Sequence, residues 1–215
     1  MPTRRATLAG LLSGAALGAP LAASFASRAD AQEAVVPRRI PGELAEQART
    51  RPALVPVGDV SGDVIFVEFF DYNCPWCRAS AGHLDALAAM PGVGVFLANY
   101  PILSDASQEA AAIALGVLAH AGPDAYRGFH TALFAARGLV DGARALAVAE
   151  ERGLDVDAVG RAAALPGIAP ALEDIVVTGR LIGFDATPST LVGPWAWEGY
   201  VDLPEKSRIV ADLRA

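Results

Sequence analysis

The chain has 215 residues, of which 53% are hydrophobic, and a formal net charge of −7 at pH 7. A chain of this length can bury one sizeable hydrophobic core. Its acidic balance argues against nucleic acid or an anionic lipid surface as a partner, because both require basic patches.

The first 31 residues have the pattern of an export signal. Arg4 and Arg5 provide a basic start, residues 8–25 form an apolar stretch, and residues 29–31 match a signal-peptidase site. The start also resembles a twin-arginine signal. An uncleaved membrane anchor is the alternative, since the stretch is about long enough to span a bilayer, but the small residues and the cleavage pattern favour removal. We therefore predict a signal peptide over residues 1–31, a periplasmic location and no stable membrane insertion after cleavage.

Residues 32–55 form a proline-rich segment ahead of the first confident strand. Prolines at positions 37, 41 and 52 limit regular structure, so we expect at most one short helix, at about 43–49. The segment is predicted to be a lead-in or an interaction arm.

A strand, a helix and a second strand follow. Residues 64–70 are apolar except for one glutamate, which is typical of a buried strand. Apolar residues at helical spacing predict a helix over 78–90, and the apolar run at 93–98 predicts another strand after a Pro-Gly break. Together these elements indicate a βαβ unit, whose two strands are parallel.

Residues 104–183 are rich in alanine and leucine and are predicted to be an all-helical insertion, divided by glycine and proline. Its helices are expected at about 105–120, 124–136, 141–152, 155–164 and 170–182. After the insertion, strand patterns at 189–192 and 195–200 predict a hairpin, and a closing helix is expected over 205–213. The sequence therefore predicts a split α/β domain with a helical insert.

The two cysteines of the chain, Cys74 and Cys77, lie between the predicted strand at 64–70 and the predicted helix at 78–90. A thiol at a helix N-terminus faces unpaired N–H groups and the positive end of the helix dipole, and both favour the thiolate. Pro75 fits the first helical turn because it has no N–H to leave unpaired. The pair is therefore predicted to be a redox-active dithiol whose first sulfur is acidic.

Three other interpretations of the cysteine pair are weaker. Zinc requires about four ligands, and His83, His120 and His130 do not supply a second ligand pair at a recognisable spacing. A structural disulfide between these cysteines would stabilise the fold little, because the loop that it closes is short. Two inert buried cysteines are the third possibility. We expect redox chemistry with no metal and no organic cofactor.

Three segments together resemble the DsbA family of exported thiol–disulfide oxidoreductases. They are EFFDYNCPWC at 68–77, NYPILS at 99–104 and ATPS at 186–189. The resemblance covers nearly all of the chain from about residue 56, and is strongest to DsbA-like and suppressor-of-copper-sensitivity C-type proteins of bacteria. It implies a thioredoxin-like α/β fold with an inserted all-helical subdomain: thioredoxin-like parts at 56–103 and 184–215, and the insertion at 104–183.

The resemblance assigns roles to individual residues. Cys74 would be the nucleophile and Cys77 the resolving thiol. Thr187 and Pro188 match the family's cis-proline loop, which lies beside the dithiol and offers backbone groups to a bound substrate strand; an ordinary trans turn is the alternative. Glu68 matches a buried acid that can accept or relay the proton of the resolving cysteine.

Glu68 and Trp76 also carry expectations of their own. A carboxylate in an apolar strand should have its pKa raised by desolvation, whereas an acid at a strand edge would face water.

Many members of the family carry histidine where this chain has Trp76, and tryptophan cannot supply a cation. We therefore expect the pKa of Cys74 to be less depressed than the value of about 3.5 known for a DsbA, and Trp76, with Pro75, to contact substrate chains.

The predicted function is that of an exported thiol–disulfide oxidoreductase, foremost an oxidase. Its partners would be unfolded or cysteine-containing exported proteins and, by family analogy, a membrane redox partner that restores its disulfide. One alternative is a disulfide isomerase or reductase of the same fold, although residues 32–55 are too short and proline-broken for a long oligomerising stalk. Another is a periplasmic chaperone or a copper-handling protein that uses soft thiolates.

Overall fold

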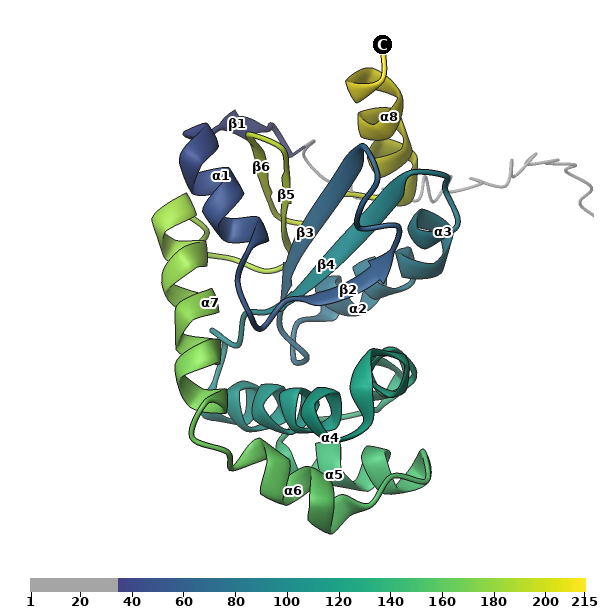
Figure 1. The fold of residues 1–215 in the computed structure, drawn as a ribbon, viewed down its shortest axis with the longest axis vertical. Helices are drawn as coiled ribbons and strands as arrows, with labels where there is room; N and C mark the ends of the chain where they lie inside the picture. Colours follow the sequence, from purple (N-terminus) through teal and green to yellow (C-terminus); the bar gives the residue numbers. More distant parts are fainter. Residues whose placement is uncertain (1–34) are drawn as a thin grey trace, which may run out of the picture. The chain divides into compact units, whose positions relative to one another are not determined.

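The computed structural model describes residues 35–215, so the predicted export signal over residues 1–31 lies outside the described residues. A mixed sheet forms the centre of this part of the chain, with the strand order β1-β6-β5-β3-β4-β2 (Figure 1). The strands are β1 (Arg38–Arg39), β2 (Val55–Gly58), β3 (Val64–Phe70), β4 (Val93–Asn99), β5 (Ser189–Val192) and β6 (Trp195–Glu198). β3 and β4 are parallel, as the βαβ pattern predicts, and β5 pairs with β3 antiparallel.

The central strand β3 is buried along its whole length because helices cover both faces of the sheet. Phe66 and Phe70 belong to a hydrophobic cluster that includes residues of helices α2 (Pro75–Ala81), α3 (Leu84–Ala88) and α8 (Leu203–Leu213). Val67 and Phe69 pack in a second cluster with helices α1 (Gly42–Arg49) and α7 (Ile168–Ile182). Side chains alternate along a strand, so Glu68 lies on the same face as Phe66 and Phe70. The sequence-based fold class, a thioredoxin-like α/β fold with a helical insertion, is confirmed.

The helix after the cysteine strand differs from its prediction. It begins at Pro75, between the two cysteines, rather than at residue 78, and it is split into α2 (Pro75–Ala81) and α3 (Leu84–Ala88). At the break, the N–H groups of Gly82 and His83 donate to the carbonyls of Ala79 and Ser80. These tighter bonds to the third preceding residue end α2.

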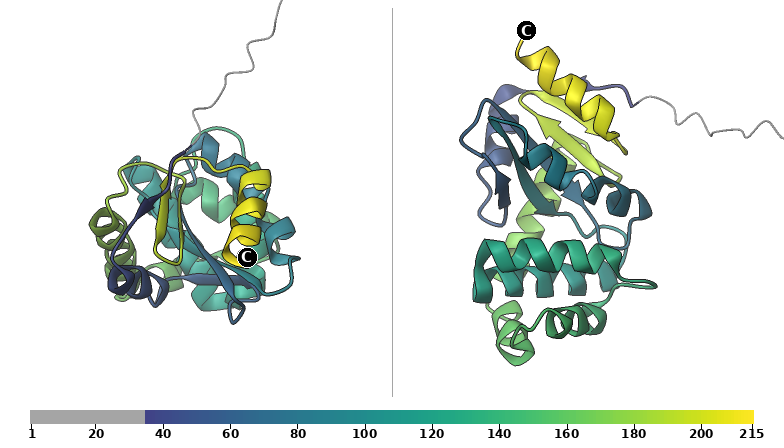
Figure 2. Two further views of the ribbon diagram at one scale, coloured as in Figure 1. Left: turned by 90° about the horizontal axis from the view of Figure 1, so that it is seen from above. Right: turned by 90° about the vertical axis from the view of Figure 1, so that its right-hand side faces the viewer.

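The helical insertion consists of four helices in the described chain: α4 (Asp105–Ala135), α5 (Gly142–Glu151), α6 (Val156–Ala163) and α7 (Ile168–Ile182). α4 spans two predicted helices, and the predicted break between them is confirmed by a kink at Gly122, where φ is 81° just before Pro123. Ser104, Asp141 and Asp155 cap α4, α5 and α6 with their side-chain oxygens. In two views, α4–α6 form a layer at one end of the sheet and α8 lies at the other (Figures 1 and 2).

No single helix within residues 35–215 is long and apolar enough to cross a membrane. One bent pair, α6 with α7 at an angle of 61°, passes the same test of length and composition. One face of α7 nevertheless packs in the hydrophobic core, through Ile175 and Ile182 among others.

The segment ahead of β2 packs on the sheet rather than extending as an arm. β1 pairs with β6 along the edge of the sheet. Helix α1 (Gly42–Arg49) forms where a short helix was predicted. The Arg51 guanidinium just after it lies 3.1 Å from the Asp174 carboxylate of α7, so this segment is joined to both the sheet and the insertion.

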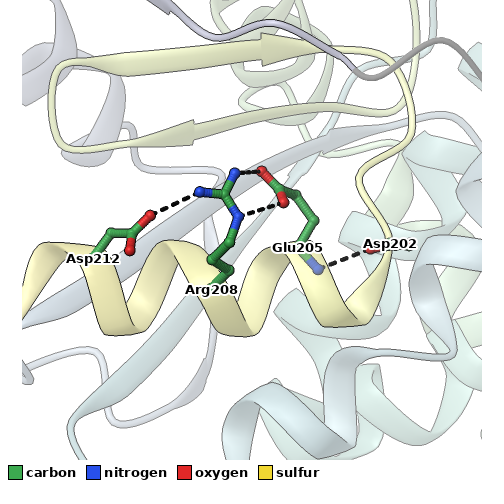
Figure 3. A network of polar contacts seen from close by, with 4 residues as sticks. All are labelled: Asp202, Glu205, Arg208 and Asp212. Carbon is green, nitrogen blue, oxygen red and sulfur yellow. Dashed lines mark hydrogen bonds and ion pairs between the residues drawn. The ribbon is translucent and has the colours of Figure 1, made fainter.

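Helix α8 (Leu203–Leu213) begins two residues earlier than predicted, because Asp202 caps it by accepting a 2.8 Å hydrogen bond from the N–H of Glu205. Its outer face carries exposed ion pairs from Arg208 to Glu205 and Asp212 (Figure 3). Its inner face buries Ile209, Val210 and, unexpectedly, Lys206.

Candidate active site

The two cysteines lie at the start of α2, directly beyond the end of β3. Cys74 is the N-cap residue of this helix and Cys77 lies in its first turn, with exposed fractions of 6% and 1%. Both are free thiols in the structure. The Sγ of Cys77 accepts a 3.5 Å hydrogen bond from the N–H of Asp71. The strand-to-helix junction expected from the sequence is confirmed.

The surroundings of the two sulfurs shift their pKa values in opposite directions. A hydrogen bond from the Cys77 thiol, helped by the N–H groups of Trp76 and Cys77, outweighs desolvation and lowers the pKa of Cys74 to about 6. Burial, together with the same hydrogen bond, raises the pKa of Cys77 far above its usual range. The first sulfur is thus the acidic one, with a pKa well above 3.5, as the sequence predicts.

The loop between α7 and β5 brings the Thr-Pro pair against Cys74. The Thr187–Pro188 peptide bond is cis, which confirms the expected isomer. The thiol of Cys74 donates a 3.1 Å hydrogen bond to the carbonyl oxygen of Thr187. The loop is itself tied down, because the Pro188 carbonyl accepts a 2.9 Å hydrogen bond from the N–H of Gly199.

Glu68 is buried beneath the dithiol in an ion pair with Lys206. The Nζ of Lys206 donates to Oε2 of Glu68 and to Oγ of Ser80, at 2.8 Å each. Lys206 has no exposed surface and Glu68 only 6%, which excludes the alternative of an acid facing water. The expected rise in the pKa of Glu68 is wrong: burial does push it upward, but the Lys206 ammonium and the Ser80 hydroxyl hold it below its usual value.

A small cavity connects this ion pair with the inner sulfur. Glu68, Cys77 and Ser80 line it, together with His130 of α4 and apolar side chains. Its volume suits about one water molecule. A proton leaving or reaching Cys77 therefore has polar groups beside it.

Residues 65–206 match the family model of the DSBA-like thioredoxin domain. The chain belongs to this family. Comparison with curated protein sequences gives no match.

Solved structures agree with the family assignment. A thioredoxin-like oxidoreductase from Silicibacter pomeroyi DSS-3 is 30% identical, with a TM-score of 0.73 over 79% of this chain and 96% of that one. The thiol-disulfide exchange protein alpha-DsbA2 from Wolbachia pipientis is 24% identical, with a TM-score of 0.69 over 80% and 95%. The catalytic domain of Proteus mirabilis ScsC is 20% identical, with a TM-score of 0.69 over 80% and 97%, and shares the fold. This DsbA-like protein is accordingly a thiol–disulfide oxidoreductase.

Trp76 gives the active site of this DsbA-like protein an aromatic edge. Its side chain is 52% exposed, and its ring centroid lies 5.4 Å from that of Tyr200. The hydroxyl of Tyr200 lies 3.1 Å from Nε2 of His83. Trp76 thus adds apolar surface beside Cys74 and no charge.

The histidines differ in their surroundings. His130 is buried among the aromatic rings of Phe70, Tyr72 and Phe134, and burial lowers its pKa to about 4. His120 is exposed on α4. Within residues 35–215, no group of three or more His, Cys, Asp or Glu side chains is placed to hold a metal ion.

Sequence reasoning missed Lys206. One signal could have identified it: this lysine lies three and four residues before Ile209 and Val210, on the apolar face of the closing helix. A charged residue among apolar ones on a core-facing stripe requires a buried partner. The sequence does not say which acid that partner is.

Proposed function

We propose that this DsbA-like protein is an exported disulfide oxidase that donates its disulfide to cysteine-containing proteins in the periplasm. The observation that carries the proposal is the lowered pKa of Cys74, about 6, at a sulfur that lies against the cis-proline loop. A stabilised Cys74 thiolate favours the reduced protein, and a protein whose reduced form is stabilised is a good oxidant.

In the oxidase reaction, the starting form carries a Cys74–Cys77 disulfide. A substrate thiolate attacks Sγ of Cys74, the Cys74–Cys77 bond breaks, and Cys77 leaves with the electron pair. Because the pKa of Cys77 is raised, it takes up a proton at once. A second substrate thiolate then attacks the substrate sulfur of the mixed disulfide, which releases an oxidised substrate and the Cys74 thiolate.

Glu68, Ser80 and Lys206 would move and hold the proton of Cys77. Glu68 shares a cavity with this thiol, so its carboxylate can take the proton when a partner reoxidises the protein, directly or through one water molecule. Lys206 holds the carboxylate in its charged form and in place. Glu68 is therefore a proton acceptor, and Lys206 a positioning residue.

The substrate would bind across the start of α2. Thr187 and Pro188 would contribute backbone groups to an extended segment, and Pro75 and Trp76 apolar contact. Reoxidation would require a membrane redox partner, a role that rests on family analogy.

The reduction potential of the Cys74–Cys77 pair, measured by equilibrium with glutathione, tests the direction of electron flow. We expect a value above about −200 mV, on the side of a disulfide donor, but less oxidising than the about −120 mV of a DsbA, because the Cys74 thiol is less acidic. A value near about −200 mV or below would favour an isomerase or reductase instead. A chain with no reversible disulfide would be a binding protein rather than an enzyme.

Export is tested separately by the mass of the protein recovered from the periplasm. Cleavage after Ala31 predicts a mature chain that begins at Gln32. Full-length protein in the membrane fraction would instead support an uncleaved anchor.

A further inference from the structure

Asp71, which lies between the end of β3 and the dithiol, is a buried acid without a paired cation. It is 1% exposed, and the ion pairs formed within residues 35–215 all involve other carboxylates. A buried carboxylate is costly unless hydrogen bonds replace the water that it has lost. Its position directly ahead of the two cysteines therefore requires an explanation.

The hydrogen bonds of Asp71 fix a turn that leads from the strand to the first cysteine. The N–H of Cys74 donates a 3.1 Å hydrogen bond to the carbonyl of Asp71, which is the pattern of a four-residue β-turn. Within this turn, Oδ1 of Asp71 accepts a 2.8 Å bond from the N–H of Asn73, as an aspartate at the first position of a turn commonly does. The local sequence thus accounts for one carboxylate oxygen.

The other carboxylate oxygen reaches a segment that is distant in sequence. Oδ2 of Asp71 accepts a 3.1 Å bond from the N–H of Leu103, in the loop between β4 and α4. An ordinary turn needs only the bond to its own backbone, whereas this second bond joins the turn to the loop beyond β4. A shift of the Asp71 backbone would therefore cost at least one of the two bonds.

The backbone N–H of Asp71 is directed at the inner sulfur. It donates a 3.5 Å hydrogen bond to Sγ of Cys77. Burial raises the pKa of Cys77, and the Asp71 N–H acts against this rise because its bond favours the thiolate. Both thiols are free in the structure, so this bond belongs to the state in which Cys77 has left the disulfide.

We propose that Asp71 is a positioning residue for the departure of Cys77: its carboxylate holds the turn so that its own N–H stabilises the leaving sulfur. The proposal rests on the proposed function, in which a substrate thiolate attacks Cys74. In that step the substrate sulfur bonds to Sγ of Cys74, the Cys74–Cys77 bond breaks, and its electron pair stays on Sγ of Cys77. A donor that is already in place stabilises this charge without rearrangement, before a proton arrives.

The first part of the test is the oxidation of a peptide by Asp71→Asn. Asparagine has nearly the same size as aspartate, but only one of its two terminal atoms can accept from an N–H, so the bond to Asn73 or to Leu103 is lost. The oxidised variant should react with an excess of a reduced dithiol peptide about tenfold more slowly, a smaller loss than that of a whole donor to a developing charge. Acid quenching and mass spectrometry follow the reaction.

The second part is alkylation of the reduced protein, in which Cys74 attacks and Cys77 does not leave. At about pH 7, above the pKa of about 6 of Cys74, the rate for Asp71→Asn should stay within about twofold of that of the unaltered protein. A merely structural role would change both reactions, because a loosened site alters Cys74 as well and exposes Cys77 to the reagent. The ratio of the two rates is therefore the readout.

Asp155→Ala is the matched control. Oδ1 of Asp155 also accepts from a backbone N–H, that of Ala158 at 3.0 Å, but it does so at the start of α6, which lies beyond α4 from the sheet (Figures 1 and 2). This variant loses a carboxylate bond of the same kind and should keep both rates.

A measurement that needs no Asp71 variant covers the case in which Asp71→Asn does not fold. In amide NMR spectra of the reduced protein, the amide proton of Asp71 should move upfield in Cys77→Ala, because its acceptor is gone. An Asp71 amide proton that does not respond to the loss of this sulfur overturns the proposal.

The other outcomes separate this role from the dithiol chemistry. An unchanged peptide oxidation in Asp71→Asn, an equal change in both of its reactions, or an equal loss in Asp155→Ala overturns the role of Asp71. The proposed function stands in each case, as long as the unaltered protein oxidises the peptide. If the unaltered protein does not oxidise the peptide, the proposed function fails and the role of Asp71 fails with it.

Discussion

The outer and the inner sulfur of this active site are controlled by different means. Around Cys74, backbone N–H groups, a neighbouring thiol and the cis-proline loop act on a sulfur near the surface. Near Cys77 lies a buried ion pair between Glu68 and Lys206. The outer site thus depends on hydrogen bonds at one helix start and from one neighbouring loop, whereas the inner site depends on a pair of opposite charges from one strand and one helix that lie 138 residues apart.

Replacing each sulfur gives the largest expected effect and separates the two roles. Cys74→Ser should abolish oxidation of a dithiol peptide, because no sulfur remains to form the mixed disulfide. Reduced Cys77→Ser, mixed with a peptide that carries a disulfide, should instead accumulate a mixed disulfide: the Cys74 thiolate attacks the peptide disulfide, one peptide thiolate leaves, and no second thiol of the protein resolves the product. Mass spectrometry of the acid-quenched reaction distinguishes the two. Mixed disulfide trapped through Cys77 in the first variant would reverse the assignment.

Breaking the buried ion pair should have the next largest effect. Lys206→Met leaves the Glu68 carboxylate in the core without its cation and should lower the free energy of unfolding by about 3–5 kcal/mol. Equilibrium denaturant unfolding measures this loss. Arg208→Met, on the exposed face of the same helix (Figure 3), is the matched control and should change stability little, because exposed ion pairs contribute little.

The pH dependence of the same variant gives a second check. In the unaltered protein the pKa of Glu68 is lowered, so its stabilising contribution is present above the unfolded pKa and is lost as pH falls through the folded one. Without Lys206, desolvation should raise the pKa of Glu68 in the folded protein above its value in the unfolded chain. The free energy of unfolding of Lys206→Met should therefore increase, relative to that of the unaltered protein, on mild acidification. The double variant Lys206→Met/Glu68→Leu should recover most of the loss. A single variant as stable as the unaltered protein would contradict the role given to the pair.

The contrast between the outer and the inner sulfur also explains which parts of the site could be predicted from the sequence. Cys74 and Cys77 lie at a strand-to-helix junction, and the strand pattern and helix-start chemistry place them without knowledge of the rest of the fold. Glu68 was assigned only through family resemblance, because an acid in an apolar strand could also lie at an edge and face water. The cis Thr187–Pro188 bond was predicted only through family resemblance, because nothing local distinguishes it from a trans turn.

The pairing of Lys206 with Glu68 could not be predicted, since it depends on how α8 packs against the sheet. The predicted rise in the pKa of Glu68 was wrong for the same reason. The sequence indicated that this carboxylate is desolvated, but it did not show the ammonium group that offsets the desolvation. The split between α2 and α3 was missed for a related reason: an apolar pattern can continue through a break in the hydrogen bonding.

The reactivity of Cys74 should depend on pH in a way that sharpens the difference between the sulfurs. With a pKa of about 6, its thiolate fraction, and so its rate of alkylation, should rise about tenfold between about pH 5 and 7 and then level off. Cys77 should stay unreactive over this range because its pKa is raised. A rate that continues to climb beyond about pH 8 would mean an ordinary thiol.

The smallest effect is expected at Trp76, one of the two residues between the cysteines. Trp76 supplies no charge, so Trp76→His should place a partial cation beside Cys74 and lower the pKa of that thiol by about one unit, the lower end of what a neighbouring opposite charge does. The reduction potential should rise with it, because the reduced form is stabilised. Trp195→His, at a tryptophan of β6 that is 37% exposed, controls for the general effect of replacing an exposed indole. If Trp76→His left the thiolate absorbance titration unmoved, charge at this position would have no part in tuning the outer sulfur, and the hydrogen bonds from the Cys77 thiol and the backbone would account for its acidity.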